Sequence, residues 1–334
     1  MWTYKMLLVL ILVGIGLWES APAQETIYMS VLSSRRHAWG KNDNPVIGLF
    51  VSKDAGKSWQ HTGWREYIRM FYTEAGSDDV LWSACGNGVL RSTDQGTSWR
   101  VTTGWEVTEV LKLSVDARNP KRVAAATAYG PILTTDGGGT WNFLLEGLSE
   151  LYASDVCINH TDGTLLLATG TGIYRRASSD TSWMPTTLQG KDIRVLTQHP
   201  ATQDIFWAGT EDDGVWKSAD GGKTWTASNT GLDHRTVYVI TIDPKEPDTL
   251  YLGTFGGGVY RSEDGGKSWR QKHKGLSILD IHALAVFSSS PGMVFAGTLN
   301  GGLYKSTDAG ETWVFNSQED AQVWGMSVQR RPGK

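Results

Sequence analysis

Carboxylates, cations and aromatic rings recur together in short polar segments along the chain, a mixture that suits the recognition of sugars. Aromatic rings stack on the apolar faces of pyranoses, and carboxylates accept hydrogen bonds from sugar hydroxyls. Two carboxylates flanking a sugar also suit acid and base roles in glycoside cleavage, for which Glu109 and Asp280 are the candidate catalytic residues. The candidate ligand-binding residues in these segments are Trp64, Arg65, Glu66, Trp105, Glu106, Tyr152, Asp192, Arg194, Arg235, His282 and Trp324.

A further polar segment, Ser33 to Val46, is longer than the other short connections and holds Arg35, Arg36 and Trp39. Binding residues tend to lie in long loops on a regular scaffold, so these three join the ligand-binding candidates. Both observations have plainer interpretations. The long segment fits a solvated insertion equally well, and the alternating charges fit a polar rim with no ligand.

Other kinds of site leave no pattern in this sequence. It contains no phosphate-binding loop, no dinucleotide fingerprint and no Ser-His-Asp spacing. Cys85 and Cys157 are the only cysteines, and neither a CxxC nor an HExxH motif is present. We therefore expect no metal and no cofactor. A net charge of −4 argues against nucleic acid as a partner.

One eight-residue phrase recurs through the chain and indicates which elements position these residues. Its first copy runs from Ser52 to Trp59 and reads SKDAGKSW. A seventh copy, Arg176 to Trp183, is degenerate but keeps the tryptophan. The key positions 54, 94, 136, 178, 220, 264 and 308 lie 40 to 44 residues apart. The aspartates of the six fuller copies are Asp54, Asp94, Asp136, Asp220, Asp264 and Asp308.

The phrase has the chemistry of a hairpin turn. An aspartate accepts backbone N–H bonds across a turn, and a glycine supplies positive φ at little cost. Three short apolar segments precede a typical copy, such as residues 237–242, 249–254 and 258–261, and the tryptophan begins a fourth. Four strands per repeat of roughly 40 residues are typical of a β-propeller blade. The sequence therefore predicts an all-β fold.

The phrase S-x-D-x-G-x-T-W resembles the Asp-box (BNR) repeat, and the resemblance covers essentially the whole mature chain. That repeat is shared by sialidases, xyloglucanase-type glycoside hydrolases, sortilin-type receptors and photosystem II assembly factors. The resemblance implies a propeller whose six aspartates are structural and lie between the third and fourth strands. It also implies that ligands bind on the opposite face, at the mouth of the central channel.

Seven copies predict a single ring of seven four-stranded blades over residues 24–334. Residues 322–329 have the character of an innermost strand, whereas residues 26–31 read as a second strand with no first strand before them. We therefore expect the C-terminal strand to complete the first blade and close the ring, which hides both sheet edges.

The first 23 residues fit a signal peptide. Lys5 supplies the positive charge, residues 6–18 form a short apolar run, and Ala21-Pro22-Ala23 fits a cleavage site. The apolar run is too short for a comfortable membrane span. We expect a secreted or periplasmic monomer without a membrane span.

The favoured function is an exported binding or interaction module with a carbohydrate or glycoconjugate ligand. The alternatives are a glycoside hydrolase or polysaccharide lyase acting at the channel mouth, and an assembly factor that binds a protein. Arg65, Arg194 and Arg235 are candidates for a sialidase-like arginine cluster, but the Arg-Ile-Pro motif of sialidases is missing. Xyloglucanase-type enzymes generally join two propellers around a cleft, whereas this chain holds one. The run from Gly253 to Tyr260 resembles the hydrolase and sortilin branches more than the assembly factors.

Overall fold

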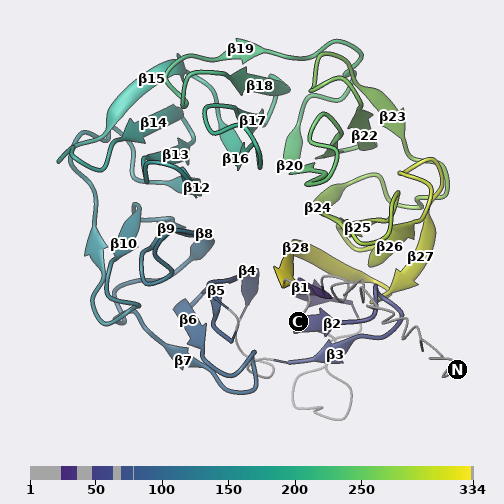
Figure 1. Cartoon of the computed structure of the whole chain (residues 1–334), viewed down its shortest axis with the longest axis horizontal. Coiled ribbons are helices and arrows are strands. Elements are labelled where there is room, and N and C mark those ends of the chain that lie inside the picture. The colour runs from purple at the N-terminus through teal and green to yellow at the C-terminus, as the bar shows by residue number, and fades with distance from the viewer. Residues whose placement is uncertain (1–23, 36–46, 63–68, 78, 332–334) are drawn as a thin grey trace, which may run out of the picture.

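The computed structural model describes residues 24–35, 47–62, 69–77 and 79–331, which form seven four-stranded antiparallel sheets arranged as blades of a ring (Figure 1). The predicted all-β, seven-bladed propeller is confirmed. Within the described part of the chain, no helix is long and apolar enough to cross a membrane.

The innermost strand of each blade lines the central channel (Figure 1). These strands are β4 (Met70–Ala75), β8 (Val110–Val115), β12 (Ala153–Ile158), β16 (Ile193–Gln198), β20 (Val237–Ile242), β24 (Ile281–Val286) and β28 (Ala321–Arg331).

The second strands are buried because each lies in the middle of its blade with other blades on both faces. They are β1 (Gln24–Ser34), β5 (Leu81–Cys85), β9 (Val123–Thr127), β13 (Leu165–Thr169), β17 (Phe206–Thr210), β21 (Leu250–Thr254) and β25 (Val294–Thr298). Both cysteines are buried and free, Cys85 in β5 and Cys157 in β12.

The third and fourth strands complete each blade toward the rim. The third strands are β2 (Gly48–Ser52), β6 (Gly88–Ser92), β10 (Ile132–Thr134), β14 (Gly172–Arg176), β18 (Val215–Ser218), β22 (Gly258–Ser262) and β26 (Leu303–Ser306). The fourth strands are β3 (Gln60–His61), β7 (Arg100–Val101), β11 (Asn142–Phe143), β15 (Met184–Gln189), β19 (Thr226–Ala227), β23 (Arg270–Lys272) and β27 (Val314–Ser317).

The repeated phrase forms the turn between the third and fourth strands. In the first copy, Asp54 Oδ1 accepts hydrogen bonds from the Ser52 hydroxyl at 2.8 Å and from the Ser58 N–H at 3.0 Å. Asp54 Oδ2 accepts the Ser58 hydroxyl at 2.5 Å, and Gly56 donates its N–H to Ser52 Oγ at 2.8 Å. The hydrogen bonds from Ser58 hold the pKa of the Asp54 carboxyl at about 2.

The tryptophan of the phrase packs between blades and explains the many tryptophans of the chain. Trp269 in blade six meets Trp207 in blade five edge to face, with ring centroids 6.4 Å apart. Its indole N–H donates to the Ser228 carbonyl at 2.8 Å. The degenerate copy keeps the hydrogen bond between blades, because Trp183 is 1% exposed and its indole N–H donates to the Leu144 carbonyl at 2.7 Å.

The ring closes through β28, which pairs antiparallel with β1 along nearly its full length. The first blade therefore combines the two ends of the described chain, in the order β28-β1-β2-β3. This arrangement confirms the predicted closure by the C-terminal strand, which covers the inner edge of β1.

Candidate functional site at the channel mouth

A β-bulge near the start of every innermost strand builds the channel mouth. At each bulge one residue has no partner on the neighbouring second strand, and its side chain is turned toward the channel. Each bulge lies next to the connection from the preceding blade, at the first residues of the innermost strand. This end of the strand is on the face of the ring opposite the aspartate turns. The seven unpaired residues are Phe71, Leu111, Ser154, Arg194, Tyr238, His282 and Trp324.

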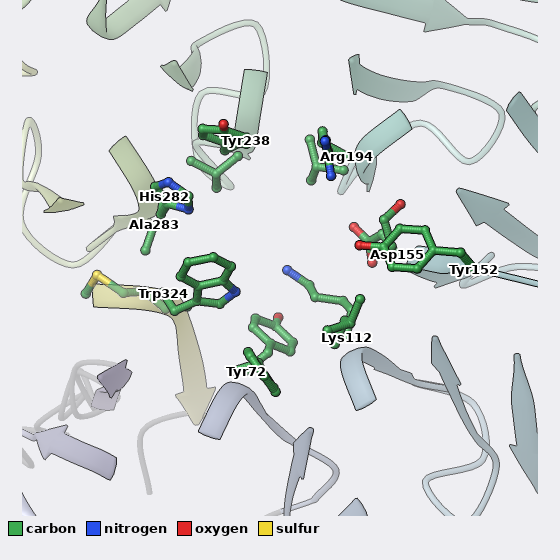
Figure 2. A pocket seen from close by; sticks show the side chains of 16 residues that line it. Tyr72, Lys112, Tyr152, Asp155, Arg194, Tyr238, His282, Ala283 and Trp324 are labelled. Carbon is green, nitrogen blue, oxygen red and sulfur yellow. The ribbon is translucent and has the colours of Figure 1, made fainter. Parts of the chain in front are cut away.

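These seven residues line a cavity of about 280 Å³, the mouth cavity. This volume is slightly below the range of roughly 300–1,000 Å³ that is typical of small-molecule sites. Figure 2 shows that the lining side chains converge on one hollow from all sides of the channel. Side chains from strands about 40 residues apart in sequence therefore form a single site.

Aromatic rings form one side of the mouth cavity. His282 stacks on Tyr238 with ring centroids 4.3 Å apart, and its other neighbour, Trp324, lies at 4.7 Å. Phe71 extends the row with an edge contact to Trp324 at 6.3 Å. This row, the aromatic arc (Tyr238, His282, Trp324, Phe71), comes from blades six, seven, one and two and gives this side of the cavity an apolar aromatic lining.

His282 is the polar member of the aromatic arc. Burial lowers the pKa of its imidazole to about 4, so the ring is neutral at pH 7. Its Nε2 is buried and has no hydrogen-bond partner in the described part of the protein. The ring therefore serves as an uncharged stacking surface between Tyr238 and Trp324.

Arg194 lines another side of the mouth cavity and is paired with two carboxylates that lie outside the lining. Arg194 donates from Nε to Glu211 Oε2 at 2.6 Å and pairs with Asp192 Oδ2 at 3.1 Å. Burial raises the pKa of Asp192, although the charge of Arg194 acts against this shift. Tyr152 completes this side of the lining. The cavity is thus aromatic on one side and ionic on the other.

A second cavity of about 440 Å³, the lower cavity, continues the channel below the mouth. Tyr72, Lys112 and Asp155 line both cavities, and we call this junction between the cavities the neck. The Lys112 ammonium lies 3.8 Å from the centre of the Tyr72 ring, a cation–π contact. Asp155 is buried and accepts N–H bonds from Val156 and Leu196 at 2.7 and 2.9 Å.

Carboxyl groups in the channel have raised pKa values. Burial raises the pKa of Glu74, in the lower cavity, to about 7, and its hydrogen bond from the Val115 N–H opposes the shift. Burial also raises the pKa of Asp155, opposed by the charge of Lys112. Glu74 therefore changes its charge near neutral pH.

The structure brings together some of the residues predicted from the sequence. Tyr152, Arg194, His282 and Trp324 line the mouth cavity, and Asp192 pairs with Arg194. The candidates Arg36, Trp39, Trp64, Arg65 and Glu66 lie outside the described residues.

The remaining candidates do not line either channel cavity. Trp105 is 92% exposed, and Arg35, Glu106, Glu109 and Arg235 are also exposed. Asp280 Oδ1 accepts the Gly256 N–H at 2.8 Å and so supports a turn of the neighbouring blade. A catalytic pairing of Glu109 with Asp280 stays a prediction.

Sequence reasoning missed Phe71, Tyr72, Glu74, Lys112 and Tyr238, which line the channel. One usable signal was present: Lys112 and Glu74 are charged residues inside otherwise mainly apolar innermost strands. Among the described residues, no group of three His, Cys, Asp or Glu side chains is arranged to hold a metal ion.

No protein-family model and no curated protein matches the sequence, but solved structures share the fold. A GH74 enzyme from Niastella koreensis aligns with a TM-score of 0.61 and 18% identity over 82% of this chain and 42% of its own. The structure titled "YCF48 bound to D1 peptide" aligns with a TM-score of 0.58 and 17% identity over 94% of this chain and 96% of its own.

The extracellular domain of BT4673, a putative one-component system from B. thetaiotaomicron, aligns with a TM-score of 0.63 and 15% identity. The match covers 78% of this chain and 35% of that one. This chain therefore spans less than half the length of the GH74 and BT4673 chains, but nearly all of YCF48. The neighbours include propellers of the families that the repeat resembles, and at these identities the likeness shows the fold.

Proposed function

We propose that this protein is an exported binding module that takes a carbohydrate or glycoconjugate in the mouth cavity. The observation that carries the proposal is the two-sided cavity, with the aromatic arc facing the ionic group of Arg194, Asp192 and Glu211. A sugar has the matching two-sided character, because its ring faces are apolar and its edge carries hydroxyls.

The test is a glycan array followed by calorimetry on the mature chain. Trp324→Ala and Tyr152→Ala each remove a ring that lines the cavity, and we expect at least tenfold weaker binding. Matched controls are Trp105→Ala and Tyr129→Ala, since both rings are well exposed and neither lines the cavity. No glycan binding, or binding that both cavity variants leave unchanged, refutes the proposal.

A protein ligand is the second candidate, favoured by exposed apolar side chains on the mouth side of the third blade. Phe143 and Leu145 approach Gly130 in the turn that also holds Tyr129, and Leu151 precedes Tyr152. The near full-length match to a propeller solved with a peptide fits the same candidate. Leu145→Asp disrupts capture of a protein partner but leaves glycan binding intact, which separates the two candidates.

Export and a monomeric state belong to the same proposal. Cell fractionation with a C-terminal tag tests export, and light scattering of the purified chain tests the monomer. For the alternative hydrolase or lyase activity, mass spectrometry of polysaccharides incubated with the protein detects new oligosaccharides. If Glu74→Gln no longer forms these oligosaccharides, the Glu74 carboxyl, whose pKa is raised, would be identified as the general acid.

A further inference from the structure

We propose that the sugar bound in the mouth cavity is anionic and that its carboxylate or sulfate pairs with the Lys112 ammonium at the neck. This inference rests on the proposed function and names the ligand class within it. Its basis is the hydrogen-bonding state of the charged groups around the mouth cavity and the neck.

Lys112 is placed to meet a ligand that fills the mouth cavity. It follows the bulge of β8, and its side chain lines both channel cavities. Figure 2 shows the Lys112 nitrogen directed into the hollow between Trp324 and Tyr152. The Tyr72 ring supports the ammonium from one side at 3.8 Å, which keeps the group oriented without using a hydrogen-bond acceptor.

The ammonium has three donors, and within the described residues it forms neither an ion pair nor a hydrogen bond with a protein acceptor. Both oxygens of the nearby Asp155 accept backbone N–H bonds, and Glu74 Oε1 accepts the Val115 N–H. The charge of Lys112 acts on both carboxyls, but among the described residues neither carboxyl forms an ion pair with the ammonium. Arg194, the other cation of the lining, is held by Asp192 and Glu211. Lys112 is therefore the lining cation whose donors await an acceptor.

An anionic sugar complements this arrangement better than a neutral or a basic one. Its charged group satisfies the Lys112 donors with a charge-assisted bond, while its ring lies against the aromatic arc. A neutral sugar offers a weaker acceptor at this point, and an amino sugar brings a like charge against the ammonium. The neck thus selects for anionic ligands.

The test compares trisaccharides of glucuronate, galacturonate and mannuronate with their methyl esters, which keep the ring and remove the charge. A 6-sulfated neutral trisaccharide distinguishes sulfate from carboxylate as the anchor. By calorimetry at pH 6, we expect at least one anionic form to bind tenfold or more tightly than its uncharged counterpart. We expect Lys112→Met to abolish that preference.

Two variants control the experiment. Lys112→Arg keeps the positive charge and should retain binding of the anionic form within a few-fold. Lys121→Met removes an exposed lysine beside an aspartate turn, on the opposite face, and should change nothing. Near-ultraviolet circular dichroism checks that Lys112→Met is folded, and the ester comparison on the unmodified protein needs no variant.

The outcomes separate the two proposals. Equal binding of the anionic and uncharged forms, or full affinity in a folded Lys112→Met variant, overturns the role of Lys112 and leaves sugar binding standing. Failure of every sugar to bind, charged or neutral, overturns both.

Discussion

The ring is closed by a buried ionic contact whose loss should cost much of the stability of the fold. Glu25 in β1 lies opposite Arg330 in β28, and its side chain is 1% exposed. Its Oε1 accepts from Arg330 Nε at 2.9 Å and from the Ser288 hydroxyl at 2.7 Å. Its Oε2 accepts the Ser289 N–H at 2.8 Å. Because Ser288 and Ser289 follow β24, this contact joins the first blade to the last.

We predict that Glu25→Ala lowers the free energy of unfolding by about 2–4 kcal/mol. Breaking a buried ion pair costs roughly 3–5 kcal/mol, and leaving a buried N–H such as that of Ser288 unpaired costs about 1–3 kcal/mol. The predicted loss is smaller than the sum of these two costs because the Arg330 side chain is 39% exposed and can be hydrated once Glu25 is removed. Such a loss is a large part of the 5–15 kcal/mol typical of folded domains.

Urea denaturation followed by tryptophan fluorescence measures this loss. The matched control is Glu246→Ala, which removes an exposed glutamate from the turn between β20 and β21 in blade six. It should change the free energy of unfolding by less than about 0.5 kcal/mol. A double-mutant cycle with Arg330→Ala should give a coupling of about 1–2 kcal/mol. A Glu25→Ala variant as stable as its control would show that strand pairing alone closes the ring.

Further predictions concern pH, the aspartate turns and the bulge. Affinity for an anionic sugar should fall between pH 6 and 8, because Glu74 is neutral below its pKa of about 7 and charged above it; Glu74→Gln should flatten this profile in calorimetry. Asp308→Ala should lower the free energy of unfolding by about 1 kcal/mol in urea denaturation. In the unmodified protein, the contribution of Asp308 to stability should be lost as the pH falls from about 4 to 2, because hydrogen bonds from Thr312 hold its pKa at about 2. An unchanged acid transition in the variant would contradict this assignment. Gly325→Ala should lower the melting temperature, because the Cβ of the new alanine would lie 2.4 Å from the Phe71 carbonyl oxygen. A variant as stable as the parent would show that β28 shifts to accommodate the added methyl group.

The architecture was predictable from the sequence because its determinants are local. The hydrogen bonds that the aspartate side chain accepts in each turn span at most four residues, as from Ser58 to Asp54, so an eight-residue phrase contains the partners of that side chain. The degenerate copy at residues 176–183 was identifiable because spacing and Trp183 survive where the aspartate does not. Ring closure followed from counting strands at the two ends of the chain.

The candidate site was predictable only in part. Tyr152, Arg194, His282 and Trp324 follow blade crossings, and the resemblance placed such segments at the mouth. Tyr238 occupies the same bulge position as His282 but was passed over, because a tyrosine in an apolar strand looks like core.

The sequence by itself determined the blade number, the turn that organises each blade and the closure of the ring, since these depend on contacts between neighbouring residues or neighbouring strands. Only the tertiary structure decided that Lys112 would stand at a neck with free donors and that His282 would be stacked between Tyr238 and Trp324. The physical reason is that a bulge in each innermost strand turns one extra side chain inward, and strands about 40 residues apart meet there.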